Sequence, residues 1–401
     1  MSTPDPVLAA PDEKAPAGSQ AALNGPAAKA APAPGEILVR SDEDRFYYAS
    51  QWELMWWRFR RHKVAFVCLW LLLAFYLVAI FSEFVAPYDP RGLSTKYARA
   101  EPSKLHVVQP GGGFGWPYVY GIKAQIVDYR IVITEDKGVA YPIGLFVHGW
   151  PYKLFGLFKT DVHLFGVDPQ AYVWLFGLDT LGRDVFSRTI YGSRISLFVG
   201  LVGLTFTFII GLLMGGISGY FGGMIDGVIQ RVTDFMNSIP MLPVLMVLAG
   251  AIPRTWPSER VFFLISILLA LVNWTGLARA VRGMLLSMRD QDYALAAQVA
   301  GASDLRIITR HLLPGITSHL IMSLTIAIPL MIIAETSLSF LGLGLQPPAV
   351  SWGVILQDVM DISKIAEQPW MVIPVIFIIV VSLLFNFVGD GLRDAADPYT
   401  M

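Results

Sequence analysis

Six segments of this 401-residue chain are long and apolar enough to cross a lipid bilayer. A membrane-spanning helix needs about 20 mostly apolar residues. The chain is 54% hydrophobic and 15% charged, whereas a soluble domain carries about 25% charged residues. These features predict an all-α polytopic membrane protein. The predicted spans are 64–86, 195–219, 228–250, 261–281, 316–341 and 370–389.

Positively charged residues are concentrated in the loops on one side of these spans. They precede the first span and crowd the loop at 282–315. Short loops rich in lysine and arginine usually stay in the cytoplasm, so we expect both termini and this loop to be cytoplasmic. The residues on that side are Arg58, Arg60, Arg61, Lys63, Arg279, Arg282, Arg289, Arg306 and Arg310, and those on the other side are Arg254, Arg260 and Lys364.

The segments outside the spans differ in composition. Residues 1–40 are rich in Ala and Pro, so we expect a disordered cytoplasmic tail. Residues 41–63 are aromatic and then basic, which is typical of an amphipathic helix on the membrane face. The loop at 87–190 is long enough for a small periplasmic insertion before the membrane core at 191–392. A cytoplasmic tail at 393–401 completes the predicted organisation.

The predicted insertion contains a pattern typical of a β-hairpin. AQIVDYRIVIT (124–134) alternates apolar and polar residues as a strand does. EDKG (135–138) has the composition of a turn, and VAYPIGLFVHGW (139–150) supplies a returning strand. The aromatic residues that follow form either the core of this subdomain or a docking surface or lid for something outside the membrane. They are Trp150, Tyr152, Phe155, Phe158, Phe165, Tyr172 and Trp174.

A polar, alanine-rich stretch lies between the fourth and fifth spans. It reads DYALAAQVAGASDLRIITRHLLPG (292–315) and is helical in composition. Ala296, Ala297 and Ala300 give the first helix a small-residue face. Small side chains let the backbone of another protein approach closely.

A turn and a second helix are predicted after these alanines. Gly301 permits a sharp turn. Ser303 or Asp304 can cap a second short helix, and Pro314 is expected to stop that helix before the membrane is re-entered. Such a rigid helix pair would fit a groove in a partner protein and transmit movement to the adjoining spans. The alternative is a helical cytoplasmic loop without a partner.

Three polar residues in or near the spans are candidates for a translocation pathway. Glu335 lies near the end of the fifth span, where ionisable groups are costly and usually face an aqueous pathway or a partner. It is therefore either a pathway or gate residue or a structural partner to a backbone donor. His319 and Asn273 are the other two candidates.

The sequence has no pattern for catalysis, metal binding or nucleotide binding. No HExxH, CxxC or GxxxxGK(S/T) motif occurs, and the six histidines lack metal-ligand spacing. The single cysteine, Cys68, lies in an apolar run and has no partner for an intrachain disulfide. An intramembrane aspartyl protease would need a second aspartate opposite Asp390, and no other span carries one in its middle. We expect no catalytic residue, no metal and no cofactor on this chain.

The stretch at 292–315 resembles the coupling loop of permeases in ATP-binding-cassette (ABC) importers. That motif reads E-A-A, a short spacer, Gly, a longer spacer, a hydrophobic residue and Leu-Pro, and here Leu295 replaces the glutamate. The resemblance implies that this loop binds a separate ATPase. The implied coupling residues are Ala296, Ala297, Gly301, Ala302, Ser303, Asp304, Arg306, Arg310, Leu313 and Pro314.

Three further stretches are similar to motifs of the dipeptide/oligopeptide (peptide/nickel) family of these permeases. They are GLDTLGRDVFSRTIYGSRISL (177–197), ETSLSFLGLGLQPPAVSWG (335–353) and FNFVGDGLRDAADP (385–398). All occur in the family's order and resemble the second permease of the pair, although Leu178 stands where threonine is usual. The family-motif residues are Asp179, Gly182, Arg183, Asp184, Gly192, Arg194, Gly389, Asp390 and Arg393.

Parts of the chain leave other interpretations open. From its residues alone, GRDVFSRTIYGSRIS is also typical of an interfacial helix whose Arg183, Arg188 and Arg194 extend to lipid headgroups. Residues 1–50 and most of 91–175 have no clear counterpart in the shorter members of the family. A self-contained secondary transporter is the alternative function, but no internal repeat typical of that class is evident.

The resemblance implies a six-span, type I ABC-importer permease in the inner membrane of a bacterium. Its implied partners are a second homologous permease, one or two ATPases that hold ATP and Mg²⁺, and a periplasmic or lipid-anchored solute-binding protein. Membrane lipid surrounds such a chain, and no nucleic acid is expected. The implied solute is a peptide, with an oligosaccharide or a nickel complex as the alternative.

Overall fold

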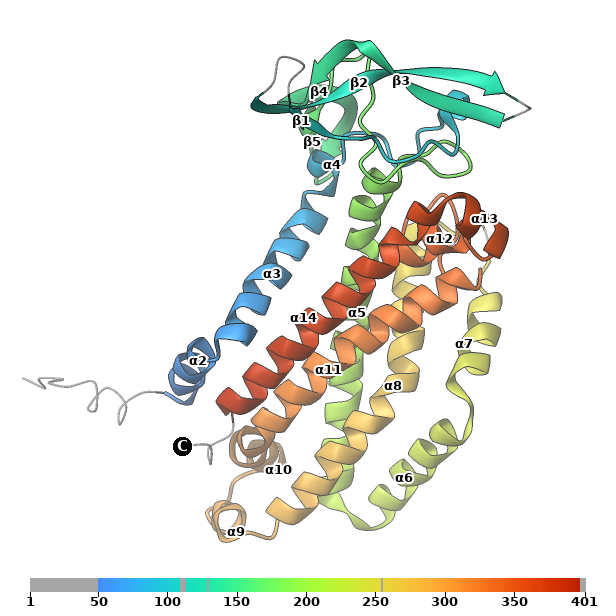
Figure 1. The fold of residues 1–401 in the computed structure, drawn as a ribbon. Coiled ribbons are helices and arrows are strands. Elements are labelled where there is room, and N and C mark those ends of the chain that lie inside the picture. Colours follow the sequence, from blue (N-terminus) through green and yellow to red (C-terminus); the bar gives the residue numbers. More distant parts are fainter. Residues whose placement is uncertain (1–49, 109–112, 128–129, 254, 397–401) are drawn as a thin grey trace, which may run out of the picture. The chain divides into compact units, whose positions relative to one another are not determined.

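The computed structural model describes residues 50–108, 113–127, 130–253 and 255–396. The predicted tail at 1–40 lies outside these residues, as do the first part of the predicted lead-in helix and the last residues of the C-terminal tail. The described chain is mostly helical, with strands between the first two long helices (Figure 1). This confirms the predicted fold class, including β structure in the external insertion.

The helices follow one another along the chain with two groups of short turns between them. They are α2 (Gln51–Arg61), α3 (Lys63–Ile80), α4 (Ser82–Val85), α5 (Val185–Phe221), α6 (Gly223–Ser238), α7 (Met241–Gly250), α8 (Ser258–Met288), α9 (Asp292–Val299), α10 (Asp304–Arg306), α11 (Leu313–Phe340), α12 (Trp352–Gln357), α13 (Ile362–Glu367) and α14 (Ile373–Ala396). The short turns are η1 (Thr95–Tyr97), the π-helical η2 (Ile307–Leu312) and η3 (Pro369–Val372).

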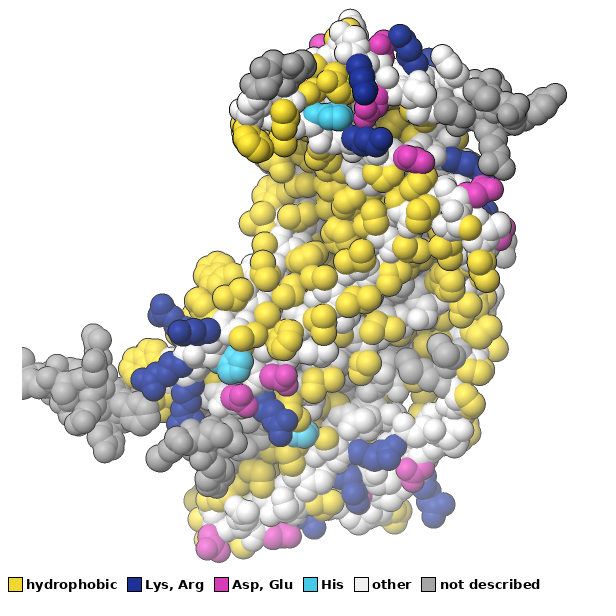
Figure 2. Space-filling view, in the orientation of Figure 1, with side chains coloured by type: hydrophobic (Ala, Val, Ile, Leu, Met, Phe, Trp, Pro, Cys, Tyr) yellow, Lys and Arg dark blue, Asp and Glu magenta, His cyan; other side chains and the backbone are white. Residues whose placement is uncertain are grey.

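Five helices in the described part of the chain are long and apolar enough to cross a membrane, or six if one bent pair forms a single span. Figure 2 shows a broad band of hydrophobic side chains over the long helices, with charged side chains gathered beyond it. Below, the end of the helices that adjoins the strands is called the outer end. The end that adjoins α9 and α10 is called the coupling end (Figure 1).

The predicted third span at 228–250 is not one continuous helix. Helices α6 and α7 meet at 87° across a short break. Ile239 after α6 is extended, with φ −91° and ψ 128°, as expected for a residue that precedes a proline. Pro240 has no N–H group with which to continue the helix. The expectation of a straight span was therefore wrong here.

Two other helix boundaries differ from the prediction. The first long helix ends at Ile80, and the last residues of the predicted span form α4 instead. The second begins at Val185, inside the predicted insertion 87–190, because Asp184 caps it by accepting a 2.7 Å hydrogen bond from the Ser187 N–H. The insertion is therefore shorter than predicted, and the second helix is longer.

Helices α5 and α8 pack closely through a row of glycines. Gly211, Gly215 and Gly219 repeat every four residues along one face of α5. A Cβ atom on Gly215 would lie 2.5 Å from the carbonyl oxygen of Ala278, and one on Gly219 would lie 2.8 Å from that of Arg282. Rows of small residues of this kind let two helix backbones approach each other in a membrane.

The strands of the described insertion form two antiparallel sheets, ordered β1–β2–β3 and β4–β5. The strands are β1 (His106–Val108), β2 (Phe114–Val127), β3 (Arg130–Pro142), β4 (Gly144–Leu154) and β5 (Phe158–Gly166). The second sheet adjoins α4, where each ring nitrogen of the buried His163 lies 3.0 Å from a carbonyl oxygen, that of Glu83 or of Trp150. This contact attaches the sheet to the outer end of the first long helix.

The predicted hairpin is present, but its turn was assigned to the wrong residues. Val127 pairs with Arg130, so the stretch 124–134 folds back on itself instead of forming one strand. The EDKG sequence at 135–138 lies within β3, where the register of the pairing shifts. Such a bulge absorbs extra residues without ending the strand, which explains why a turn-like sequence occurs inside it.

The aromatic residues of the insertion do not all belong to a core. Tyr152 and Trp174 are buried, and Trp150, Phe165 and Tyr172 are partly buried. Phe155 and Phe158 are exposed. The core interpretation therefore accounts for most of these residues and leaves these two phenylalanines unexplained.

Candidate coupling and pathway sites

The first helix of the predicted coupling loop ends in a left-handed turn at Gly301. The φ angle of this residue is +80°, and a Cβ atom there would have no neighbour within 4 Å. The Gly301 N–H donates to Gln298 O at 2.9 Å, and the Ala302 N–H donates to Ala297 O at 3.0 Å. This pair of bonds is the Schellman pattern, in which glycine is favoured because of its positive φ. The geometry gives the physical reason for a glycine at this position.

The alanine face predicted for this helix is divided between two directions. Ala294 is buried, and Ala297 packs partly against the same cluster around Leu285 and Ile307. Ala296 and Ala300 are exposed and point elsewhere. Large apolar side chains are exposed as well, namely Leu295 (45%), Val299 (90%) and Leu305 (71%). We call Leu295, Ala296, Val299, Ala300 and Leu305 the exposed coupling face.

The second part of the loop differs from the prediction at its start. Ser303 occupies the N-cap position of α10 but makes no side-chain capping hydrogen bond. The carboxylate of Asp304 instead accepts a 2.8 Å hydrogen bond from the Tyr220 hydroxyl at the end of α5. The loop is thus joined to α5 through a contact that its own sequence does not reveal.

Pro314 does not stop the second helix, as predicted, because it stands in the first turn of α11. There its missing N–H group costs little. The wider π-helical turn η2 precedes it, with the Leu313 N–H bonded to Ile308 O. Residues 304–340 therefore form one helical unit that runs from the loop into the membrane part. Of the other predicted coupling residues, Arg306 and Arg310 are exposed, and Ala302 and Leu313 are partly buried.

Three helices are tied together beside this loop. Arg282 of α8 donates to both carboxylate oxygens of Asp226 on α6, at 2.5 and 2.6 Å. The Ser218 hydroxyl of α5 donates to the same carboxylate at 2.5 Å. Arg289 donates to the carbonyl oxygen of Tyr220 at 3.0 Å. Asp226 is thus an ion-pair partner, and plain solvation is not the account of it.

At the outer end, the first family motif forms a buried ion cluster. Asp179 accepts hydrogen bonds from the Leu181 and Arg183 N–H groups, each at 2.9 Å, and from the Arg183 guanidinium at 2.6 Å. The Arg188 guanidinium binds the same carboxylate, and both side chains are almost fully buried, at 2% and 1% exposure. Arg183 also binds Asp358 at 2.8 Å, which joins the start of α5 to the segment after α12.

Other residues of this motif have equally specific partners. Arg194 lies 2.5 Å from Glu83 of α4. Gly182, with φ +78°, touches the backbone of Ser94, where a side chain would not fit. A Cβ atom on Gly192 would lie 3.2 Å from the backbone of Ser351. The three arginines of this stretch therefore bind carboxylates, and the interpretation as headgroup anchors is not supported.

Burial changes the acidity of two carboxyl groups in this cluster. Burial raises the pKa of Asp184 to about 7, although its Ser187 hydrogen bonds act in the opposite direction. One of its oxygens has no hydrogen-bond partner. Burial also raises the pKa of Asp358, against the lowering effect of the neighbouring arginines. The outer end thus holds charge in a poorly hydrated place.

Glu335 lies inside this same end of the molecule and is fully buried. It accepts hydrogen bonds from the hydroxyls of Ser339 at 2.8 Å, Ser351 at 3.0 Å and Ser196 at 3.4 Å. These serines belong to α11, to the start of α12 and to α5. Its surroundings are those of a structural partner, with hydroxyl instead of backbone donors.

A groove between α5, α8 and α11 contains one of the predicted pathway residues. It has a volume of about 210 Å³ and is mostly apolar, with Asn273, Thr207 and Ser323 as its polar side chains. The hydroxyl of Thr207 is buried without a hydrogen-bond partner. His319 is half-buried on α11 and does not line the groove. The groove therefore gathers Asn273 but not Glu335 or His319.

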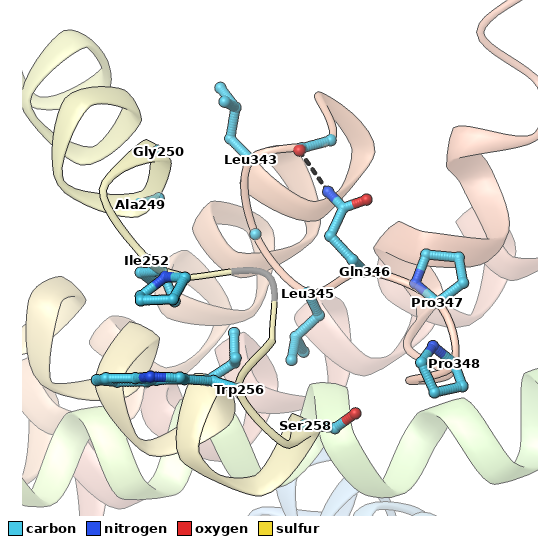
Figure 3. Close-up of a pocket in the computed structure, with 14 residues that line it drawn as sticks. Ala249, Gly250, Ile252, Trp256, Ser258, Leu343, Leu345, Gln346, Pro347 and Pro348 are labelled. Atoms are coloured by element: carbon cyan, nitrogen blue, oxygen red, sulfur yellow. Dashed lines mark hydrogen bonds between the residues drawn. The ribbon is translucent and has the colours of Figure 1, made fainter.

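A smaller pocket of about 120 Å³ lies at the outer end, between the segment that joins α7 to α8 and the segment after α11 (Figure 3). Trp256 lines one side, and Pro347 and Pro348 line the other. The Gln346 amide donates to the carbonyl oxygen of Gly342 across it (Figure 3). This places the 335–353 motif beside the loop between the third and fourth spans.

The C-terminal motif has a packing role in α14. Gly391 touches Ala65 of α3, and a Cβ atom on Gly389 would lie 3.0 Å from the Thr325 methyl group of α11. The two charged residues of the motif, Asp390 and Arg393, are exposed. The glycines allow α14 to fit between two other helices.

Sequence reasoning missed several of these functional contacts. Tyr220, Asp358, Thr207 and Ser323 were not candidates, and Arg188 was considered only as a headgroup anchor. A buried arginine close to a family motif could have suggested a carboxylate partner. The other contacts join residues far apart in the chain, so no local signal was present.

Comparison with known proteins identifies the group to which these features belong. Residues 208–400 match the family described as the binding-protein-dependent transport system inner membrane component. Residues 50–102 match the N-terminal transmembrane domain of oligopeptide transport permease C.

Individual relatives agree with these matches. The dipeptide transport system permease protein DppC of Bacillus subtilis is 43% identical over 235 residues, 57% of this chain and 70% of the relative. The DppC of Lactococcus lactis is 32% identical over 345 residues, 86% of this chain and 89% of the relative. One solved structure, an inward-facing MetNI methionine ABC transporter, is 19% identical over 52% of this chain and 96% of that chain, with a TM-score of 0.43.

These matches confirm the resemblance found in the sequence motifs. Members of this family are permease components of ABC importers; they are not themselves catalytic, and they work with ATPase and substrate-binding partners. The chain is a multi-pass membrane protein and belongs to the family of binding-protein-dependent transport permeases, with dipeptide and oligopeptide permeases as its relatives.

Proposed function

We propose that this chain imports peptides as one of two permease subunits. The names of its relatives, which are dipeptide and oligopeptide permeases, support a peptide as the solute. The groove lined by Thr207, Asn273 and Ser323 supports a path with few fixed charges. Such a path suits peptides of differing side chains because its polar groups are uncharged.

The observation that carries the proposal is the exposed coupling face. Large apolar side chains such as Val299 and Leu305 are costly to leave in water, and a patch of them marks an interaction site. An ATPase subunit that covers this face would bind α9 and the turn at Gly301. The basic residues Arg306 and Arg310 would lie at the border of the same contact.

Movement of the ATPases would reach the membrane part along two connections. The first is the helical unit 304–340, which runs without interruption from the loop into the fifth span. The second is the hydrogen bond between Asp304 and Tyr220 at the end of α5. ATP binding and hydrolysis would shift the permease between two states in which the groove opens to opposite sides.

The remaining parts of the machine are other chains. A second, homologous permease would face the groove and complete the path. One or two ATPases would hold ATP and Mg²⁺, and a periplasmic or lipid-anchored binding protein would deliver the peptide to the outer end. The chain itself would lie in a bacterial inner membrane with its coupling end and both termini in the cytoplasm. The excess of basic residues at that end supports this orientation.

Purification in a mild detergent tests the proposal. We expect the tagged chain to retain a second permease and chains that carry phosphate loops, identified by mass spectrometry. Val299→Asp should lose the ATPases and keep the second permease, whereas the control Val139→Asp on β3 should keep both. A chain that purifies alone and moves peptides in liposomes without ATP would overturn the proposal.

A further inference from the structure

The tip of the β4–β5 hairpin has an unusual, nearly symmetrical sequence, KLFGLFK, at residues 153–159. Lys153 pairs with Lys159 across the two strands, and Leu154 pairs with Phe158. The tip therefore consists of apolar residues framed by two opposed lysines. The proposed transport function does not account for this arrangement.

The apolar residues of the tip are exposed to solvent. The exposed fraction is 77% for Leu157, 66% for Phe158 and 45% for Phe155. Single exposed apolar residues are ordinary, but three neighbouring large ones at the end of a hairpin form a patch that marks an interaction surface.

The backbone at the tip is strained in a way that favours the aromatic side chain over local preference. Phe155 has φ 54°, and Gly156 has φ 72°. Two consecutive positive φ angles are typical of a type I′ turn, where Asn-Gly and Asp-Gly are preferred. Phe146 on β4 also has a positive φ, of 55°. Strain at bulky residues persists where function requires the side chain at that place.

Both strained phenylalanines lie against the outer end of the first long helix. The ring centre of Phe155 is 5.5 Å from that of Phe81, and the ring centre of Phe146 is 6.1 Å from that of Phe84. Phe81 directly follows α3, and Phe84 belongs to α4 (Figure 1). The tip thus lies at the level where the first span leaves the bilayer, which is the depth that aromatic side chains prefer.

The two lysines need an anionic partner. Like charges directly opposite each other on a β-ladder destabilise the pair. Lys153 and Lys159 are both exposed, and neither has an ion-pair partner among the described residues. Phosphate groups of lipids would lie at the correct depth for them, with the apolar tip deeper and the charged ammonium groups above it.

We propose that residues 153–159 dock into the lipid headgroup region at the outer end of the membrane, with Lys153 and Lys159 bound to the phosphates of anionic lipids. The hairpin thereby anchors the insertion to the bilayer beside the first span. This inference rests on the chain's membrane location and not on the identity of its solute.

Depth-dependent quenching in nanodiscs tests the inference with the full chain and its bound subunits. A fluorophore is placed at Leu157→Cys in a Cys68→Ala background, and the nanodiscs contain phosphatidylcholine and phosphatidylglycerol. We expect a doxyl-labelled lipid to remove most of the fluorescence and aqueous iodide to remove little. The control is Val139→Cys on β3, which is 50% exposed and should show the opposite pattern.

A second comparison tests the lysines. Lys153→Gln with Lys159→Gln should reduce the quenching by doxyl lipid at residue 157, and omission of phosphatidylglycerol should do the same for the parent chain. Quenching that ignores both changes would contradict lipid-phosphate binding. Free access of iodide to residue 157 in nanodiscs would overturn the proposal. Protection that arises only after a binding protein is added would assign the tip to that protein instead.

Discussion

The two ends of the helical part are held together by different kinds of contact. At the outer end, Asp179, Arg183 and Arg188 form a buried ion cluster that reaches Asp358 across 175 residues of sequence from Arg183. At the coupling end, an exposed hydrogen bond between Tyr220 and Asp304 joins the loop to α5.

This difference separates a rigid end from an end that is built for contact. Buried charges are costly to separate because each would be left without a partner in a poorly hydrated place. An exposed hydrogen bond exchanges readily with water, and the turn at Gly301 has open space around it. We infer that the outer end resists movement locally, whereas the coupling end can rearrange when a partner binds.

Removal of one buried charge should have the largest effect. Arg188→Ala would leave the Asp179 carboxylate buried beside only one arginine. We expect a loss of about 3–5 kcal/mol in the free energy of unfolding, measured by titration with sodium dodecyl sulfate. Arg194→Ala, at a partly exposed ion pair, should cost about 1 kcal/mol or less. Equal losses for both variants would remove the distinction between buried and exposed contacts.

The buried Asp184 should make the stability of the outer end depend on pH. Its pKa is about 7 in the folded protein against an ordinary value of 3.8, so between these values the folded chain holds a proton that the unfolded chain has lost. The free energy of unfolding should therefore fall as pH rises from about 4 to about 7, by at most about 1.4 kcal/mol per pH unit. Above this window both states are ionised, and this contribution to the slope ends.

Asp184→Asn supplies the comparison for that measurement. Asparagine can still accept the hydrogen bond from the Ser187 N–H, but it does not titrate. The variant should lose this part of the pH dependence and be more stable than the parent chain at pH values above the window. Superimposable pH profiles would contradict the role of Asp184.

At the coupling end, substitutions of Gly301 should act through the backbone. The φ angle of +80° and the open space around a Cβ atom mean that strain, and not a clash, sets the cost. Gly301→Val should cost about 1–3 kcal/mol or unfold the turn locally, and it should reduce the amount of ATPase that copurifies. Gly301→Asn should be tolerated because asparagine accepts left-handed angles. If both variants bind the ATPase equally well, the turn has no part in coupling.

The smallest change in stability is expected for Tyr220→Phe. It removes one exposed hydrogen bond to Asp304, which contributes about 0.5–1.5 kcal/mol at most. Peptide uptake per ATP hydrolysed should fall more than stability does, since this contact links the loop to α5. Ser287→Ala, which removes an exposed hydroxyl bonded within α8, is the matched control. An unchanged ratio of uptake to hydrolysis in Tyr220→Phe would show that force reaches the membrane by α11 alone.

The sequence predicted most of the fold because its strongest signals are local. Apolar length gave the long helices, and the spacing of Ala296, Ala297, Gly301 and Pro314 predicted the coupling loop. The bend at Pro240 was open to prediction because proline interrupts helices. The turn of the β2–β3 hairpin was not, because EDKG fits a turn and a bulge equally well.

The candidate site was only partly predictable. The contact between Tyr220 and Asp304 spans 84 residues, and periodicity carries no information on such a distance. The same holds for the partners of Glu335, which come from three separate elements. The π-helical turn before Pro314 depends on the packing of Ile307 and Leu312 in the buried cluster at this end, so the helix continues where the sequence predicts an end.

Photo-crosslinking from the coupling face tests the central claim most directly. Benzoylphenylalanine replaces Val299, which is 90% exposed on α9, and in a control it replaces Ile362, which is 81% exposed on α13. The account predicts that light joins residue 299, but not residue 362, to a soluble chain that contains a phosphate loop. If residue 299 forms crosslinks only to lipid or to none of the copurifying chains, α9 is not the site at which the ATPase binds.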